Sequence, residues 1–358
     1  MTRTIQIATG CYSRSGTGRG RGITIQTLTV GPETLQLDER ANVDLPDPSF
    51  VLWSPDGRLL YTVTETVRSR LLALRVDDDG RAEVAAQLDL DGKHPCHLGY
   101  AANPSALIIA HYGSGEIETV RLSPDGLPVE SIDLDRHGDA EDRASGLEAH
   151  AHEVVRLPGT DLLAVPDLGM DRVYLHRQDA AGHVDHAGEI TLRRGSGPRH
   201  VAADHEAGAI YISCEHSGEL ATAHRLPAAN AAESHYGARS AEQRWSVRSV
   251  VPASGSSDTN LPSHIELSAD EETLLIANRG PDTLALFTLA GDRPELVDEI
   301  AVGTHPRHFA RVDDLVLVAA QTADRIDAVR VRGQRLESAG DPVACPSVSC
   351  IAVRPGQR

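Results

Sequence analysis

The apolar residues of this chain fall into short runs that end in polar residues and are separated by turns. The run at 60–65, Leu-Tyr-Thr-Val-Thr-Glu, follows the segment 54–58, Ser-Pro-Asp-Gly-Arg, whose composition is typical of a tight turn. The segment 172–176, Arg-Val-Tyr-Leu-His, alternates polar and apolar residues. This pattern predicts many short β-strands joined by turns.

A four-residue marker repeats along the chain and divides the strands into units. It consists of a proline or small residue, a variable residue, a histidine or its substitute, and an apolar residue. Complete copies begin at Pro48, Pro95, Ala151, Pro198, Pro262 and Pro306, and a degenerate copy begins at Pro346. The copies are roughly 40–64 residues apart, which brackets the 40–50 residues of a propeller blade.

A second marker follows each complete copy by about 15 residues. It is a β-rich run that ends in a polar residue, and the ends are Glu65, Tyr112, Asp167, Glu215, Arg279 and Gln321. Each unit therefore contains a strand, a turn, a strand, a turn and a third strand, followed by a weaker fourth. An antiparallel unit of this kind, repeated radially, is a propeller blade.

The two ends of the chain supply the parts of one further unit. Strands at 5–8 and 23–28 lack a leading marker, whereas the segment 346–353 has a marker but no following strands. Joining them hides two sheet edges. We therefore expect an all-β fold, a seven-bladed β-propeller, closed by pairing of the N- and C-terminal strands. It is expected to form a single domain over residues 1–358.

Two segments interrupt the repeat. Residues 135–149 are polar and acidic, and we expect them to form an exposed connection between blades. Residues 228–260 are rich in alanine and serine, and their part from Trp245 to Pro252 is expected to be an outer strand between loops.

The repeat also predicts where polar side chains meet. The first marker opens the innermost strand of a blade and the second closes the neighbouring antiparallel strand, so both lie at the same edge. One set at this edge comprises Ser49, Cys96, His152, Arg199, Ser263 and Arg307, and the other comprises the polar ends of the second marker. An adjacent tier comprises His97, Glu153, His200, His264 and His308.

These sets predict a site for an anion and a carbonyl group at one mouth of the channel. The alternative is that polar residues only line a wet channel and cap strand ends. Arginine is costly to remove from water without a partner, so the set as a whole favours a functional site.

Composition narrows the choice of partners. The net charge of −18 disfavours nucleic acid and anionic membranes. The five cysteines are odd in number and include no CxxC pair, which argues against a disulfide framework or a structural zinc site. The N-terminus lacks the apolar run of a signal peptide, and no stretch approaches the roughly 18 apolar residues of a membrane span. A cytoplasmic protein with a small-molecule substrate is expected.

Several segments together resemble the seven-bladed propeller lactonases of the bacterial 6-phosphogluconolactonase type. They are 54–61, 150–152 (His-Ala-His), 166–173, 195–200 (Gly-Ser-Gly-Pro-Arg-His), 276–280 (Ile-Ala-Asn-Arg-Gly) and 306–309 (Pro-Arg-His-Phe). The resemblance implies hydrolysis of 6-phosphogluconolactone to 6-phosphogluconate, a step of the pentose phosphate pathway, without a cofactor. It departs from the family at His264, where an acidic residue is usual, and at His111, where asparagine is common.

Carried onto this sequence, the resemblance places the catalytic residues at His152, Arg199, Glu215 and Arg279. Either Glu215 or His152 would act as the base, and the two arginines would stabilise the oxyanion. Residues expected to bind the substrate are His97, Tyr112, His200, His264, Arg307, His308 and Gln321. No metal is expected, although His150 and His152 lie two apart and are the alternative as a metal-binding pair.

Two other functions stay open at this point. One is a non-catalytic propeller that binds a metabolite or a protein, because propellers host many functions. The other is a lactonase or cycloisomerase that acts on an unphosphorylated or muconate-type lactone.

Overall fold

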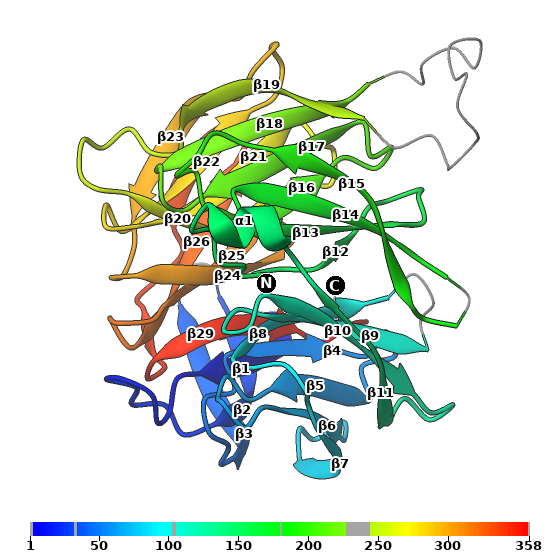
Figure 1. Cartoon of the computed structure of the whole chain (residues 1–358). Helices are drawn as coiled ribbons and strands as arrows, with labels where there is room; N and C mark the ends of the chain where they lie inside the picture. The colour runs from blue at the N-terminus through cyan, green and yellow to red at the C-terminus, as the bar shows by residue number, and fades with distance from the viewer. Residues whose placement is uncertain (1–2, 32–33, 102–104, 180, 227–243, 357–358) are drawn as a thin grey trace.

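Seven antiparallel sheets surround a central channel in the structure of this chain (Figure 1). The structure is a computed structural model and describes residues 3–31, 34–101, 105–179, 181–226 and 244–356. In the described part of the chain, each blade has four strands from the channel outward. Six blades follow sequence order, blade 1 has the C-terminal strand innermost, and the last blade has an additional short strand. The predicted seven-bladed β-propeller is confirmed.

The strands of the seven blades have the following bounds. Blade 1 consists of β29 (Val348–Val353), β1 (Arg3–Cys11), β2 (Ile23–Val30) and β3 (Leu35–Val43). Blade 2 consists of β4 (Phe50–Trp53), β5 (Leu59–Val63), β6 (Arg70–Val76) and β7 (Ala82–Asp89). Blade 3 consists of β8 (Pro95–Tyr100), β9 (Ala106–His111), β10 (Glu116–Leu122) and β11 (Pro128–Arg136).

Blades 4 to 7 continue in the same order. Blade 4 consists of β12 (Val155–Arg156), β13 (Leu162–Asp167), β14 (Arg172–Gln178) and β15 (Val184–Thr191), and blade 5 of β16 (Pro198–Ala203), β17 (Ala209–Cys214), β18 (Glu219–Arg225) and β19 (Trp245–Pro252). Blade 6 consists of β20 (Leu261–Leu267), β21 (Thr273–Arg279), β22 (Thr283–Thr288) and β23 (Glu295–Ala301). Blade 7 consists of β24 (Pro306–Val312), β25 (Leu315–Ala320), β26 (Arg325–Arg332) and β27 (Arg335–Ser338), and β28 (Val343–Ala344) pairs with β26.

The two ends of the chain close the ring. Strand β29 pairs with β1 in antiparallel register, with Ile7 opposite Val353 and Thr9 opposite Ile351. In Figure 1 the red C-terminal strand lies beside the blue N-terminal strands. The predicted pairing of the terminal strands is therefore confirmed, and it covers an edge that would otherwise be open.

The hydrophobic core consists of layers between neighbouring blades. The inner strands are buried on both faces, so successive residues enter different layers. In β5, Leu60 packs against blade 1, whereas Tyr61 and Val63 pack against blade 3. This two-sided burial explains why the second marker of each unit is a continuous apolar run rather than an alternating one.

A register break opens the innermost strand of several blades. The ladder skips one residue between Pro95 and His97, between Pro198 and His200, and between Pro306 and His308. The skipped residues are Cys96, Arg199 and Arg307. A bulge releases a residue from strand pairing and redirects its side chain, a device common beside binding sites.

Three expectations about local structure have mixed outcomes. The outer strand from Trp245 to Pro252 is confirmed as β19, while residues 227–243 lie outside the described residues. The expectation of an exposed connection at 135–149 is wrong in part, because β11 continues to Arg136, His137 is buried, and α1 spans Ala140–Ala144. No helix in the described residues is long and apolar enough to cross a membrane.

Candidate active site

Two arginines from neighbouring blades hold one carboxylate at a mouth of the channel. Arg199 Nε lies 2.9 Å and Arg279 Nη2 2.6 Å from Glu215 Oε2. Arg199 is 2 % exposed and Arg279 is 4 % exposed, whereas the side chain of Glu215 retains 18 % exposure. The carboxylate therefore faces the opening and the arginines form the wall behind it.

Backbone contacts fix the positions of Arg199 and Glu215. Asp171 accepts hydrogen bonds from the N–H groups of Gly195 and Gly197, at 2.7 and 2.8 Å, and Glu215 N–H donates to Gly197 O at 2.7 Å. Gly197 has a φ of +62°, and a Cβ there would meet the ring of His216 at 2.6 Å. This turn needs glycine for both reasons.

Arg279 is anchored more completely than Arg199. Arg279 donates from Nε to Leu261 O at 3.0 Å and from Nη2 to Pro262 O at 3.3 Å. The Nε and Nη1 atoms of Arg199 have no hydrogen-bond partner among the described residues, because the contact of Nε with Glu215 is close but not aligned. Donors left open on a buried guanidinium favour a ligand that supplies the acceptors.

His152 adds an unpartnered imidazole to this wall. Its Nδ1 is buried and has no hydrogen-bond partner among the described residues, and its ring lies 5.8 Å from the ring of Tyr112. Burial, followed by the charges of Arg199, Arg307 and Arg279, lowers the pKa of His152 well below its ordinary value. The imidazole is therefore neutral near pH 7 and has a lone pair available.

The charges of the cluster shift the pKa values of its other members. Burial alone would raise the pKa of Glu215, but Arg199 and Arg279 outweigh it and the pKa is lowered. Burial, followed by repulsion from Arg279 and Arg307, lowers the pKa of Arg199 to about 9. At neutral pH the cluster thus holds charged arginines, an ionised Glu215 and a neutral His152.

A small cavity adjoins the cluster on the side of blades 1 and 7. It has a volume of about 320 Å³, and Tyr12, Arg307, Gln321 and the loop at 15–19 line it. The guanidinium of Arg307 lies 5.2 Å from the centre of the Tyr12 ring, and Tyr12 Oη donates to Glu65 Oε2 at 2.8 Å. Gln321 Oε1 is buried without a hydrogen-bond partner among the described residues. The cavity thus combines two arginines, Arg19 and Arg307, with one unsatisfied amide oxygen.

Sequence reasoning missed Tyr12. It directly follows Cys11, which is paired with Val348 at the start of β29, just as Glu215 follows Cys214, the partner of Pro198. Tyr12 therefore occupies in blade 1 the position that Glu215 occupies in blade 5. Assigning β1 to the second strand of its blade would have identified it.

The rim is the edge of the blades at this mouth of the channel, where the polar ends of the second marker are predicted to lie. The prediction for Asp167 is wrong by one position. Asp167 pairs with Ala151 as Cys214 pairs with Pro198, so the residue at the rim of blade 4 is Leu168. Asp167 is buried, contacts His137 Nδ1 at 2.7 Å, and accepts hydrogen bonds from the N–H groups of His150, Gly169 and Met170. It stabilises the turn after β13 instead of facing the channel.

The pair His150 and His152 does not converge. His150 Nδ1 lies 2.7 Å from Tyr112 O, and its ring stacks on the Tyr112 ring at 4.7 Å. The hydrogen bond with a carbonyl oxygen requires that Nδ1 carry the proton. Tyr112 therefore positions His150, whose Nδ1 is used by this hydrogen bond and is not available to a metal.

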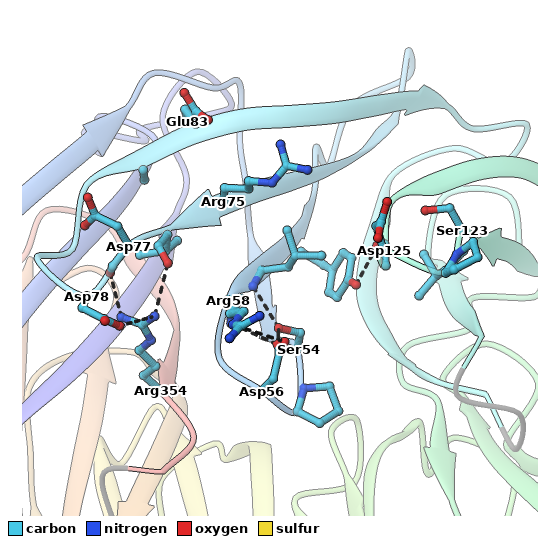
Figure 2. A pocket seen from close by; sticks show the side chains of 18 of the residues that line it. Ser54, Asp56, Arg58, Arg75, Asp77, Asp78, Glu83, Ser123, Asp125 and Arg354 are labelled. Atoms are coloured by element: carbon cyan, nitrogen blue, oxygen red, sulfur yellow. Dashed lines mark hydrogen bonds and ion pairs between the residues drawn. The ribbon is translucent and has the colours of Figure 1, made fainter.

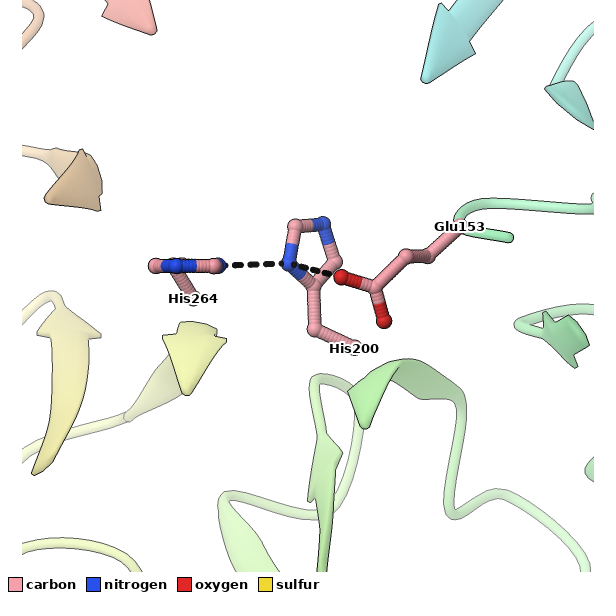
Figure 3. Close-up of side chains that lie close together, drawn as sticks. All are labelled: Glu153, His200 and His264. Carbon is pink, nitrogen blue, oxygen red and sulfur yellow. Dashed lines mark hydrogen bonds and ion pairs between the residues drawn. The ribbon is translucent and has the colours of Figure 1, made fainter. Parts of the chain in front are cut away.

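A deeper tier lies behind the rim, formed by His97, Glu153, His200, His264 and His308. Burial lowers the pKa of His97 and of His308 to about 3, and lowers the pKa values of His200 and His264 well below the ordinary one. Burial raises the pKa of Glu153 to about 8. Glu153, His200 and His264 point toward one another (Figure 3).

A larger cavity lies on the opposite face of the propeller, between blades 2 and 3. It has a volume of about 1360 Å³ and is lined by turns of blades 2 and 3, including Ser54–Arg58 and Ser123–Gly126 (Figure 2). Arg58 and Arg81 are exposed there, and the one deeply buried charge, Arg354, is fully hydrogen-bonded. Among the described residues, open buried donors converge at the other end, so we place the candidate active site at the rim despite its smaller cavity.

Comparisons with known proteins find a matching family and relatives along most of the chain. The family described as "Lactonase, 7-bladed beta-propeller" matches residues 6–353. The chain is 27 % identical to the 6-phosphogluconolactonase of Enterobacter sp. (strain 638) over 302 residues, which cover 81 % of this chain and 83 % of that protein. It is 23 % identical to the 6-phosphogluconolactonase of Bacillus subtilis (strain 168) over 305 residues, which cover 84 % and 83 %.

Solved structures show the same fold. The periplasmic gluconolactonase PpgL of Pseudomonas aeruginosa has a TM-score of 0.84 at 23 % identity, over 98 % of this chain and 99 % of that one. A putative 6-phosphogluconolactonase of Bacteroides fragilis has a TM-score of 0.81 at 20 % identity, over 98 % of both chains. At these identities the structural likeness establishes the fold alone.

Proposed function

The chain belongs to the seven-bladed β-propeller lactonase family, and from that premise we propose that it hydrolyses 6-phosphogluconolactone to 6-phosphogluconate. The observation that carries the proposal is the buried Arg199 beside the neutral His152: its Nη1 has no hydrogen-bond partner among the described residues, and its Nε is ion-paired with Glu215 without an aligned hydrogen bond. Open donors beside a neutral base are what the attack of water on a lactone carbonyl requires.

His152 is proposed as the base. Glu215 is held by two guanidinium groups, which lower its pKa and occupy its Oε2 atom. The imidazole of His152 keeps a lone pair and takes a proton from water as the water oxygen bonds to the lactone carbonyl carbon. The ring C–O bond then breaks, and the imidazolium returns the proton to the departing alkoxide.

Arg199 and Arg279 are proposed to stabilise the oxyanion. The carbonyl oxygen becomes negative when water adds, and a buried guanidinium with an open N–H gains most from a negative acceptor. Glu215 orients both arginines and offsets part of their repulsion. Arg279, anchored on the carbonyls of Leu261 and Pro262, keeps the pair in place.

Arg307 is proposed to bind the phosphate. It lines the adjoining cavity with Gln321, and the nearby Arg19 is already paired with Asp324 at 2.5 Å. A cation in a partly enclosed cavity suits a phosphate oxygen. The names of the relatives from Enterobacter and Bacillus support a phosphorylated sugar lactone.

One observation favours a second candidate, an unphosphorylated gluconolactone. Glu65 accepts a hydrogen bond at 2.8 Å from Tyr12, which lines the same cavity, and a carboxylate behind that wall repels a phosphate but not a neutral sugar. A non-catalytic propeller that binds a metabolite would also use the donors of Arg199, but it is less favoured because it needs no neutral base beside them.

Turnover of the two lactones tests the proposal. Each is measured against its uncatalysed hydrolysis, with wild type and with Arg307→Met. We expect kcat/KM to be higher for 6-phosphogluconolactone, and Arg307→Met to lower it about 100-fold for that substrate while changing it less than about threefold for gluconolactone. Equal values for both lactones would favour the unphosphorylated substrate, and the absence of any acceleration would contradict lactonase activity.

A further inference from the structure

Three donor atoms from consecutive blades converge behind the rim. Glu153 lies two residues before the start of β12, His200 lies on β16 and His264 lies on β20. His200 Nδ1 is 3.0 Å from His264 Nδ1 and 3.1 Å from Glu153 Oε1, and all three atoms lie within 4.8 Å of one another (Figure 3). The strands that deliver them are held by the packing between blades 4, 5 and 6.

Hydrogen bonds alone do not satisfy this arrangement. His200 Nδ1 carries either one proton or one lone pair. If Nδ1 carries the proton and donates it to Glu153, no second proton is left for the contact with His264. If Nδ1 carries the lone pair and accepts a hydrogen bond from His264, it has no proton to donate to Glu153. One of the two short contacts therefore lacks a good hydrogen bond in either tautomer.

A single cation between the three atoms would satisfy both contacts. In a tetrahedral zinc site with bonds of about 2.0–2.2 Å, donor atoms are separated by about 3.3 Å, close to the 3.0 and 3.1 Å found here. Two imidazoles and one carboxylate are ligands that suit Zn²⁺, with a position left open. We propose that Glu153, His200 and His264 bind a divalent transition metal of the Zn²⁺ type inside the channel.

Neighbouring groups orient the ligands. Val201 N–H donates to Glu153 Oε2 at 2.7 Å, which leaves Oε1 facing the histidines. His97 Nδ1 accepts from Val154 N–H at 3.3 Å, so its other nitrogen carries the proton and lies 3.8 Å from Glu153 Oε1. The His264 ring stacks on His308 at 4.2 Å. Such partners fix ligand geometry in metal sites.

The surrounding charge decides which metal fits. The guanidinium of Arg199 is near both His200 and His264, since its charge acts on each of them, and this charge repels a cation. Only a metal that bonds strongly to imidazole offsets this repulsion, which excludes Mg²⁺ and Ca²⁺, cations that prefer oxygen ligands.

The metal site does not depend on the proposed lactone hydrolysis, because none of its three ligands has a role in the proposed catalytic step. A bound metal would join blades 4, 5 and 6 through their inner strands. It should therefore stabilise the folded chain whatever the substrate, which provides a readout other than activity.

Calorimetric titration of chelator-treated protein with Zn²⁺ tests the proposal. We expect one Zn²⁺ per chain and a rise in Tm of about 4 °C at about a hundredfold excess of Zn²⁺ over Kd. Glu153→Gln, which keeps the shape of the side chain, should weaken binding at least about tenfold. His205→Gln is the matched control, since it removes an exposed histidine that contacts Glu271 at 2.7 Å, and it should bind Zn²⁺ as the wild type does.

Three results would overturn the proposal: no stoichiometric Zn²⁺ in the wild type, unchanged affinity in Glu153→Gln, or loss of binding in His205→Gln. If Glu153→Gln does not fold, Co²⁺ added to the wild type decides the question. Intense absorption of low-coordinate, imidazole-bound Co²⁺ supports the site, and the weak spectrum of hydrated Co²⁺ contradicts it.

Discussion

Two buried arginines at opposite ends of the inner strands differ in how their donors are used. Arg354, which follows β29, is 7 % exposed. It donates to Gly57 O at 2.8 Å, Gln6 Oε1 at 2.6 Å, Asp77 O at 2.8 Å and Val76 O at 3.2 Å. Arg199, near the start of β16, is 2 % exposed; its Nη1 has no hydrogen-bond partner among the described residues, and its Nε is ion-paired with Glu215 at 2.9 Å without an aligned hydrogen bond.

The difference separates a structural arginine from a binding one. Burial is common to both, so burial does not mark a site. A guanidinium whose donors are all taken by fixed acceptors holds the surrounding turns together. A guanidinium with unused donors can bind a ligand that provides the missing acceptors. The larger cavity beside Arg354 (Figure 2) is therefore a weaker candidate for the active site than the smaller one beside Arg307.

The largest expected effect is on catalysis at the rim. Arg199→Met should lower kcat on the lactone about 100- to 1000-fold, the usual result of losing an oxyanion donor. Its Tm should stay the same or rise, because removing an incompletely satisfied buried charge relieves a desolvation cost. Steady-state kinetics and thermal unfolding measure the two quantities. Full activity in Arg199→Met would contradict the proposed role.

The next effect is on stability at the opposite end. Arg354→Met leaves four acceptors without their donor and should reduce the free energy of unfolding by about 3 kcal/mol. Its kcat should match that of the wild type when folded. Denaturant unfolding measures the change, and Arg81→Ala, an exposed arginine at the same end, should change stability by less than about 0.5 kcal/mol. An Arg354→Met variant as stable as the wild type would contradict the structural role of Arg354.

The smallest effect is the pH dependence of kcat/KM. His152 works as a base only when neutral, and its lowered pKa means that activity persists below pH 6.5 and falls only at a considerably lower pH. Arg199, with a pKa of about 9, loses its charge above that pH, and activity should fall about tenfold per pH unit there. A pH–rate profile with an acid limb near 6.5 would show that the base is not the buried His152.

The fold could be predicted from the sequence because each blade repeats the same local pattern of strands and turns. The markers beginning at Pro198 and Pro306 open inner strands, and their bulges bring Arg199 and Arg307 out of the ladder. Since the second marker ends at the same edge, the meeting of Arg199, Glu215 and Arg279 could also be anticipated.

Other features of the site depend on details that no repeat encodes. Asp167 and Leu168 differ by one position in the ladder, and that offset decides whether a side chain caps a turn or lies at the rim. The convergence of Glu153, His200 and His264 depends on side-chain rotamers and on backbone bulges. Which donors of Arg199 lack a hydrogen-bond partner depends on the positions of all the acceptors around it in the folded chain, which the repeat does not specify.

The position of a bound product tests the central claim most directly. A crystal structure with 6-phosphogluconate is expected to show its carboxylate on Arg199 and Arg279 and its phosphate on Arg307. Product bound only in the cavity lined by Ser54–Arg58 and Arg354, with the rim empty, would contradict the assignment of the active site.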